Sequence, residues 1–222
     1  MSTAAILARM EMADSEPLHA PMPGAEALTE PLRSRWSPSI FDDEHRLTRD
    51  QVETLLHAAQ WAPSWGNSQP WAFLVAERGS AGHDVLVRHL SRGNSGWVPR
   101  ASVVFVTATQ VGPGPDGSDD KGWRGADYAL HDLGQAAAHL TLQARALGLH
   151  AHQFAGFDHE AVHDELGVPA WFRVMTGIAV GLRGNPDDVP ERDREREQRQ
   201  RHRRPLADFV WGDAWGDPWT TA

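Results

Sequence analysis

Hydrophobic residues recur at the three-to-four-residue spacing of an amphipathic helix in several stretches of the chain. One stretch follows Thr48 and Gln51, which have the spacing of a capping box, and it must end before Pro63. The longest covers 126–147 and is followed by Gly148, a residue type that commonly ends a helix. Two shorter helices are expected after the capping residues Ser80 and Asp158.

Four other apolar runs are rich in β-branched and aromatic residues, which is typical of strands. They cover 71–76, 101–109, 150–154 and 173–181. Because strands and helices are interleaved, the sequence predicts an α+β or α/β fold in a single domain over 31–222. Residues 1–30 show no periodicity and are expected to form a flexible N-terminal arm, or one that only a partner subunit orders.

The composition of the 222 residues narrows the possible chemistry. The chain has no cysteine, which excludes disulfides, iron–sulfur clusters, thiolate zinc sites and cysteine nucleophiles. No apolar run approaches the roughly 18 residues of a membrane span, and no basic region precedes the short apolar stretch at 4–8. We therefore expect a cytoplasmic protein without a membrane partner.

Charge is unevenly distributed along the chain. The formal net charge is −9, yet residues 191–204 contain seven arginines and four acidic residues. An acidic protein with one basic segment is poorly suited to nucleic acid, which requires many distributed phosphate contacts. A single anion held by a few arginines fits better. The first four arginines alternate with acids and are expected to form a solvated face, whereas Arg201 and Arg203 are candidates for an anion contact.

A polar loop at 64–70 separates the first predicted helix from the first predicted strand. The rigid elements on either side allow this loop to present its serine, asparagine and glutamine side chains to a ligand. Such side chains suit a polar heterocycle or a polyol. The alternative is a polar turn in which the same side chains satisfy their own backbone.

The sequence around this loop resembles the nitroreductase family of flavoproteins, whose hallmark is an APS-x-x-N-x-QPW-x-F string. Every hallmark position is present, as Ala62, Pro63, Ser64, Asn67, Gln69, Pro70, Trp71 and Phe73. Further similar segments follow the family order, at Arg35-Trp36-Ser37 with Phe41, Gly93-Asn94 with Trp97, Ala155-Gly156-Phe157 and 203–206. The resemblance spans roughly residues 31–210.

The resemblance implies an α+β fold with a central, mostly antiparallel sheet flanked by helices. It also implies an intertwined homodimer with one FMN in each of two interface sites. Arg35 and Ser37 would hold the FMN phosphate, helped by Arg201 and Arg203. Ser39 stands where the family usually has a second Lys or Arg, so the phosphate site has one cation fewer or the late arginines compensate.

The same resemblance assigns residues to the flavin ring. Asn94 would bind the pyrimidine edge, and the backbone N–H of Gly156 would face the flavin N5 atom. Pro63, Ser64 and Asn67 would approach the same flavin from the other subunit. The predicted cofactor-binding set also includes Trp36, Ser39, Gln69 and Ala155.

The activity implied is an oxidoreductase in which NADH or NADPH delivers hydride to FMN and leaves. An electron-poor acceptor, such as a nitroaromatic or a quinone, would then take two electrons in a ping-pong cycle. Because the cofactor carries out the electron transfer, no catalytic side chain is required. The alternatives are an FMN-dependent dehydrogenase or oxidase, a reductive dehalogenase of the same fold, and a flavin-binding protein without turnover.

Four further patterns were weighed against these assignments. The segment 159–163 matches the HExxH zinc motif, as His159-Glu160-Ala161-Val162-His163, with His150 and His152 as possible additional ligands. No downstream ligand completes the motif, so no metal is expected.

Trp123 is a candidate for the substrate side of the flavin, or for an interface. Trp211, Trp215 and Trp219, spaced by four, are expected to form a helical stripe against a partner subunit. The Asp-rich 117–120 lacks the spacing of a calcium loop.

Overall fold

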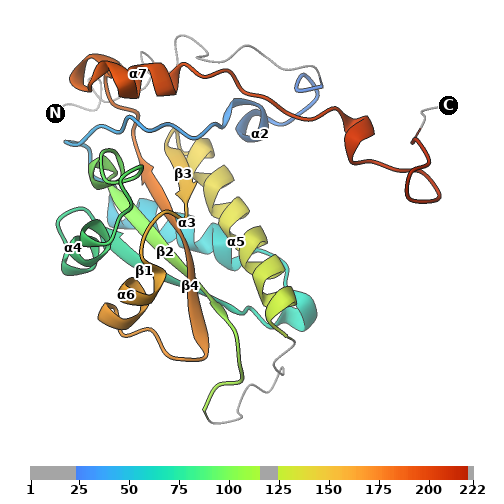
Figure 1. Ribbon diagram of the computed structural model, residues 1–222, viewed down its shortest axis with the longest axis horizontal. Coiled ribbons are helices and arrows are strands. Elements are labelled where there is room, and N and C mark those ends of the chain that lie inside the picture. The colour runs from blue at the N-terminus through green and yellow to red at the C-terminus, as the bar shows by residue number, and fades with distance from the viewer. Residues whose placement is uncertain (1–23, 116–124, 220–222) are drawn as a thin grey trace.

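The protein is built around one four-stranded antiparallel sheet, seen here in a computed structural model that describes residues 24–115 and 125–219 (Figure 1). The strands lie in the order β1-β2-β4-β3. They are β1 Trp71–Glu77, β2 Val103–Gln110, β3 His150–Phe154 and β4 Phe172–Gly181. Trp123, the Asp-rich 117–120 and residues 1–23 of the predicted arm lie outside the described ranges.

The strand pairing confirms the α+β class and the four predicted strands. Every neighbouring pair is antiparallel, as in Phe105 of β2, which lies opposite Val75 of β1 and Ile178 of β4. A parallel α/β sheet would instead require a crossover helix between neighbouring strands. The register between β2 and β4 shifts once, between Thr107 and Ala108, where Met175 of β4 has no partner on β2.

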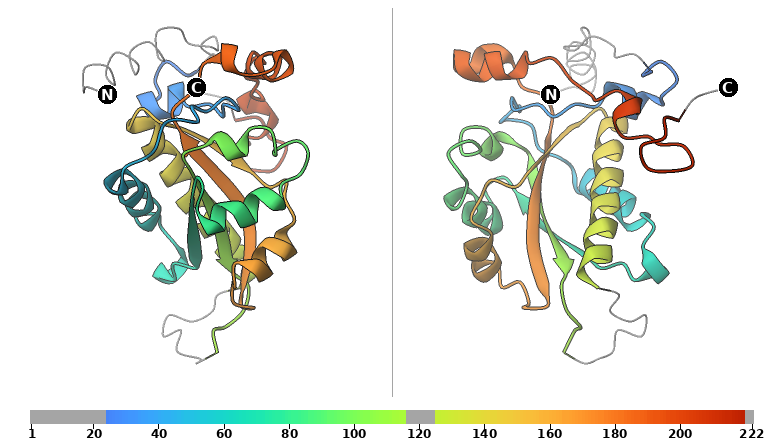
Figure 2. Two further views of the ribbon diagram at one scale, coloured as in Figure 1. Left: turned by 90° about the vertical axis from the view of Figure 1, so that its left-hand side faces the viewer. Right: turned by 45° about the vertical axis from the view of Figure 1, so that its right-hand side comes forward.

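Helices cover both faces of the sheet and give three layers (Figure 2). Helices α3 Arg49–Gln60 and α5 Ala126–Ala146 pack on one face, and α4 Ala81–Arg88 and α6 His159–Glu165 on the other. Side chains of β2 alternate between the layers: Phe105 contributes to the α3/α5 core and Val106 to the α4/α6 core. No helix within 24–115 or 125–219 is both long enough and apolar enough to cross a membrane.

The capping residues read from the sequence begin these helices. Thr48 accepts a hydrogen bond from the Gln51 N–H, and the Gln51 side chain accepts one from the Thr48 N–H, which completes the predicted capping box. Ser80 and Asp158 cap α4 and α6 in the same manner. Gly148 follows α5 with φ +73°, the left-handed conformation that favours glycine.

Two short helices lie beyond the ends of the strands, above β3 in the view of Figure 1. They are α2 Glu30–Ser34 and α7 Glu191–Glu197 (Figure 1). The first begins inside the predicted 1–30 arm, and the second was not predicted, because its residues are charged and show no apolar spacing. Acidic residues in the first turn of α7 and arginines in its last turn complement the helix dipole, and this was the signal available in the sequence. Short 3₁₀ turns complete the chain: η1 Trp65–Asn67, η2 Val98–Arg100, η3 Pro186–Asp188 and η4 Leu206–Asp208.

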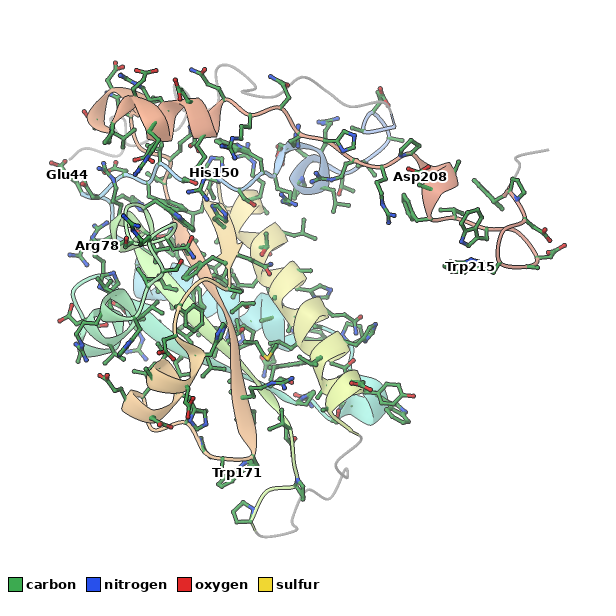
Figure 3. The ribbon with its side chains drawn as sticks, viewed as in Figure 1. Glu44, Arg78, His150, Trp171, Asp208 and Trp215 are labelled. Atoms are coloured by element: carbon green, nitrogen blue, oxygen red, sulfur yellow. The ribbon has the colours of Figure 1, made fainter. Side chains whose placement is uncertain are left out.

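The predicted tryptophan stripe does not form. Residues 206–219, here called the C-terminal segment, extend past α2 and away from the sheet (Figure 3). Instead of a helix, Trp211 pairs with Pro218 in a small closed turn, where the Gly212 N–H donates to Asp217. Gly216 has φ +94° in this turn. Glycine and proline therefore override the four-residue spacing of the tryptophans.

Candidate functional site

Three of the predicted anion-binding arginines meet at one cavity. Arg35 lies at the end of α2, and the chain after α7 brings Arg201 and Arg203 to the same place. The three side chains, called the arginine cluster below, line a cavity of about 170 Å³ together with Arg33 and with Leu28, Leu32, Gly24 and Ala25. Residues more than 160 positions apart in the sequence therefore present their cations to one space.

The arginine cluster has excess positive charge. None of its members forms an ion pair with a carboxylate of the described residues. The Arg35 Nε atom is buried without a hydrogen-bond partner among them. Burial, and after it the positive charges of Arg203 and Arg201, lower the pKa of the Arg35 guanidinium. A phosphate would remove this repulsion and supply acceptors to planar donors, so these residues fit the phosphate of a cofactor.

Arg201 and Arg203 differ in their present contacts. The Arg201 guanidinium donates to the carbonyl oxygens of Arg33 (3.0 Å) and Arg35 (3.2 Å), the carboxyl end of α2. The Arg203 side chain is exposed and donates only to the carbonyl of the neighbouring His202 within the described chain. Arg203 is thus free to turn towards an anion, whereas Arg201 already fastens α2.

Asn94 and Gly156, both predicted to face the flavin ring, are in direct contact. The Asn94 side-chain amide donates to the Gly156 carbonyl (3.0 Å), and the Ser91 N–H donates to the same oxygen (2.9 Å). A Cβ atom at Gly156 would lie 2.6 Å from Asn94 Nδ2 and 2.6 Å from Ser91 Oγ. The close approach of these two segments therefore requires glycine at this position.

A stacked pair of rings connects Asn94 to the chain beside Arg35. The Trp97 indole N–H lies 3.2 Å from the Asn94 side-chain oxygen, and the Trp97 ring stacks on His152 at 4.2 Å. Nδ1 of His152 lies 2.8 Å from the carbonyl oxygen of Pro38. Burial lowers the pKa of His152, so the ring is neutral near pH 7 and Nδ1–H donates to that carbonyl. The residues predicted to face the flavin ring and the segment predicted to face its phosphate are thus joined within one chain.

Residues 63–69, called the 63–69 loop below, include most of the polar loop predicted at 64–70. They are held in a strained conformation. Asn67 and Gln69 have φ of +56° and +50°, in the left-handed region that side-chain-bearing residues seldom adopt. Ser64 Oγ accepts from the Gln69 N–H at 3.0 Å, and the Gln69 side chain donates to Asn67 Oδ1 at 3.1 Å. These bonds are those expected of a self-satisfied polar turn, but the strain and the exposed position of Asn67 and Gln69 are features of binding loops.

Asp132 of α5, which was not singled out in the sequence, anchors this loop. The carboxylate is 2% exposed and accepts from the Trp65 N–H at 2.9 Å. Gln135 adds a second link, to the Pro63 carbonyl at 3.3 Å. An acidic residue on the otherwise apolar buried face of the helix was the signal that could have identified Asp132.

The two halves of the predicted site do not meet within one chain. The 63–69 loop contacts α5 at Asp132, whereas α2 contacts it at Arg145, which donates to Ser34 Oγ at 2.7 Å. Thirteen residues of helix between Asp132 and Arg145 correspond to about 20 Å. One chain therefore presents the loop at one end of α5 and the arginine cluster at the other.

The remaining predicted residues do not line the cavity of the arginine cluster. Ser37 and Ala155 are exposed. Ser39 is buried, and its backbone N–H donates to the Glu197 carboxylate at 2.8 Å. Trp36 packs edge-on against the His150 ring of β3 at 5.8 Å.

The histidines of the HExxH pattern are engaged within the protein. His159 Nε2 lies 3.0 Å from the Met175 carbonyl oxygen, and His163 Nδ1 lies 3.0 Å from the Asp164 carboxylate. Helix α6, on which they lie, has seven residues. Within the described ranges, no group of three or more histidine, aspartate or glutamate residues is arranged to hold a metal ion.

Comparisons with known proteins agree with this architecture. The family model described as "Nitroreductase family" matches residues 32–108 and 81–182. A structure described as an oxidoreductase containing FMN is 31% identical, covers 86% of this chain and 95% of its own, and superposes with a TM-score of 0.75. Protein DrgA of Synechocystis is 26% identical over 73% of this chain and 86% of its own.

A protein of Archaeoglobus fulgidus named as an NADH dehydrogenase/NAD(P)H nitroreductase is 25% identical over 78% of this chain and 94% of its own. The matched segments of the family model include the 63–69 loop, Arg35, Asn94 and Gly156, so they contain most of the residues described above. With this match over most of its length and an antiparallel sheet of the same fold, the chain belongs to the nitroreductase family.

Proposed function

We propose that the protein is an FMN-dependent oxidoreductase that uses NADH or NADPH to reduce electron-poor acceptors such as nitroaromatics or quinones. The observation that carries the proposal is the arginine cluster, which gathers three unpaired cations around one small cavity. The FMN of the 31%-identical structure and the NAD(P)H in the name of the Archaeoglobus relative support it. When bound, FMN would supply the two-electron chemistry, taking hydride from the nicotinamide and passing electrons to the acceptor.

The residues of this chain bind and orient the cofactor. Arg35 and Arg203 would hold the phosphate, and Asn94 would bind the pyrimidine edge of the ring. Gly156 would present its backbone N–H towards N5, at a position where a side chain would force the segments apart. The bond between Asn94 and the Gly156 carbonyl would keep the two ring contacts at a fixed separation.

The 63–69 loop would complete the site from a second copy of the chain. The distance along α5 separates this loop from the arginine cluster of its own subunit, so a flavin held by both requires two subunits. Trp65 of this loop contacts Tyr128, with ring centroids 3.9 Å apart and ring planes tilted by 58°, and about half of each residue is exposed. Such aromatic faces favour flat acceptors, which supports nitroaromatics and quinones as the substrate class.

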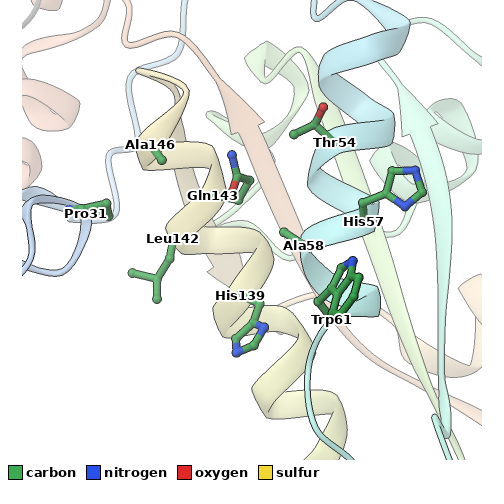
Figure 4. Close-up of a pocket in the computed structure, with 9 residues that line it drawn as sticks. All are labelled: Pro31, Thr54, His57, Ala58, Trp61, His139, Leu142, Gln143 and Ala146. Carbon is green, nitrogen blue, oxygen red and sulfur yellow. The ribbon is translucent and has the colours of Figure 1, made fainter.

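A surface for the second copy is available on α3 and α5. An apolar groove of about 550 Å³ lies between the two helices, bordered by Trp61 and Leu142 (Figure 4). Trp61 is 82% exposed. The C-terminal segment also carries exposed apolar side chains, those of Leu206, Phe209, Trp215 and Trp219. Apolar surface of this kind is typical of an obligate interface, which supports a homodimer.

Replacing Leu142 with aspartate is expected to convert the dimer to monomers at micromolar concentration. The change places a charge in the apolar groove without altering the cores on either side of the sheet, which do not include Leu142. Sedimentation equilibrium measures the effect. Val75, an exposed apolar residue of the edge strand β1, gives V75D as the matched control, which should remain dimeric. A wild-type protein that is monomeric with FMN bound would contradict the two-subunit site.

The proposed function is tested by the visible spectrum of the purified protein. The chromophore released on denaturation is identified by mass, and NADH and NADPH are then added without oxygen. FMN that bleaches with either nucleotide and recovers its colour with a nitroaromatic or quinone is the expected result. FMN that stays oxidised would point instead to a dehydrogenase, another flavin reaction or a protein without turnover. A protein that cannot be loaded with FMN would overturn the proposal.

A further inference from the structure

Three side chains of the 196–201 segment, which covers the end of α7 and the residues after it, bind the main chain around the proposed site. Arg196 donates to the Gly93 carbonyl at 3.2 Å, beside Asn94. Glu197 accepts from the Ser39 N–H at 2.8 Å. Arg201, as described above, donates to the carbonyls that end α2. The 196–201 segment therefore connects the phosphate-facing and ring-facing parts of one subunit.

Glu197 is the buried member of this set. It is 4% exposed, and one carboxylate oxygen lies 3.9 Å from Nε of Arg183, which in turn lies over the Trp36 ring at 5.6 Å. Burial raises the pKa of the Glu197 carboxyl, whereas the Ser39 N–H and Arg183 favour its charged form. A buried carboxylate is costly to maintain, and aliphatic residues would attach a helix end more simply. Its contact with Ser39 fixes α7 at one point of the 35–40 segment.

The consequence of this attachment falls on Arg203. Glu197 binds the backbone at Ser39, and Arg201 binds it at Arg35. The residues between Glu197 and Arg201 therefore have a fixed path beside the 35–39 segment. Arg203 lies two residues beyond Arg201 and lines the same cavity as Arg35. Without the Glu197 contact, Arg196 would still hold the segment to Gly93, but Arg201 would have to hold it to the chain around Arg35 without Glu197, and Arg203 could shift relative to Arg35.

We propose that Glu197 is a positioning residue for anion binding, which sets Arg203 opposite Arg35 by tying the end of α7 to the backbone of Ser39. The inference rests on the proposed phosphate site. Glu197 acts through Arg203 and does not itself touch the cofactor. In this arrangement, the cation missing at position 39 from the family pattern is supplied by the segment that Glu197 positions through the backbone N–H of that residue.

The test compares FMN with riboflavin, which has the same ring but no phosphate. Both are titrated into the full-length apoprotein, and Kd is measured from flavin fluorescence. For Glu197→Gln, the Kd for FMN is expected to rise about 10-fold while the Kd for riboflavin stays unchanged, and Arg203→Ala should give the same pattern. Glu195→Gln, the same substitution at an exposed site of the same helix, is the matched control and should bind both flavins normally.

A shorter carboxylate provides a second variant if Glu197→Gln does not fold. Glu197→Asp keeps the charge but withdraws it from Ser39, and a roughly 3-fold selective loss of FMN affinity is expected. Equal weakening of both flavins would show that Glu197 is merely structural and would overturn the inference. An unchanged preference for FMN in both variants would also overturn the inference, and the proposed phosphate site would then still stand. If the wild-type protein binds FMN no better than riboflavin, the phosphate site fails first, and the inference fails with it.

Discussion

Replacing Arg35 with alanine is expected to weaken FMN binding about 100-fold, which corresponds to about 2.7 kcal/mol. Hydrogen bonds to charged groups contribute about 1.5–3 kcal/mol each, and a guanidinium can make two of them to one phosphate. In the structure, Arg35 faces Arg201 and Arg203 across one cavity, and its buried Nε has no partner among the described residues. Its loss should therefore remove binding energy without breaking contacts that stabilise the fold.

Two variants separate charge from geometry in this experiment. Arg192→Ala changes the net charge equally, but its side chain is 84% exposed on α7, so FMN affinity should be unchanged. Arg35→Lys keeps the charge and loses the planar pair of donors, and an intermediate affinity is expected. Kd is measured by quenching of flavin fluorescence, and thermal unfolding checks that each variant is folded. Wild-type affinity in Arg35→Ala would mean that the phosphate binds elsewhere.

The fold could be predicted largely because its signals are local. The cap at Thr48 and the stop at Gly148 each depend on residues within a few positions of each other, and the structure places both where the sequence does. The same local reasoning is wrong for 211–219, where the spacing of the tryptophans predicts a helix but Gly216 has φ +94° in a turn. Helix α7 was missed because it is marked by charge order instead of apolar spacing.

The site could be predicted only in part, because its contacts join distant segments. The resemblance to the nitroreductase family predicts Asn94 and Gly156 as flavin contacts, and the structure places these two residues in contact with each other. No pattern indicates that Glu197 meets Ser39, 158 positions away, or that the 63–69 loop lies at the opposite end of α5 from Arg35. Both placements follow from packing of the folded chain. The position of the 63–69 loop is the reason that the proposed function needs a site formed by two subunits.

Replacing Gly156 with alanine is expected to slow reduction of the bound flavin by NADH on the order of 100-fold, the scale of losing one well-placed backbone donor. The new methyl group would lie 2.6 Å from both Asn94 Nδ2 and Ser91 Oγ, so the 91–97 and 155–157 segments must separate. That movement displaces the Gly156 N–H and the Asn94 amide together, because they share a hydrogen bond. Crowding of this kind also costs about 1–3 kcal/mol of stability. Anaerobic stopped-flow absorbance measures the rate, and FMN should remain bound through the arginine cluster.

Gly96 provides the matched control for this variant, because it lies in the same loop and a Cβ atom there meets nothing within 4 Å. Gly96→Ala should therefore reduce its flavin at the wild-type rate. Adding Ser91→Gly to Gly156→Ala removes one of the two close contacts, and a partial recovery of the rate is expected because the segments can approach again. If Gly156→Ala is reduced as fast as the wild type, the backbone at 156 does not face the flavin. The ring would then have to be held by groups other than the Asn94–Gly156 pair, even if the phosphate assignment to Arg35 stands.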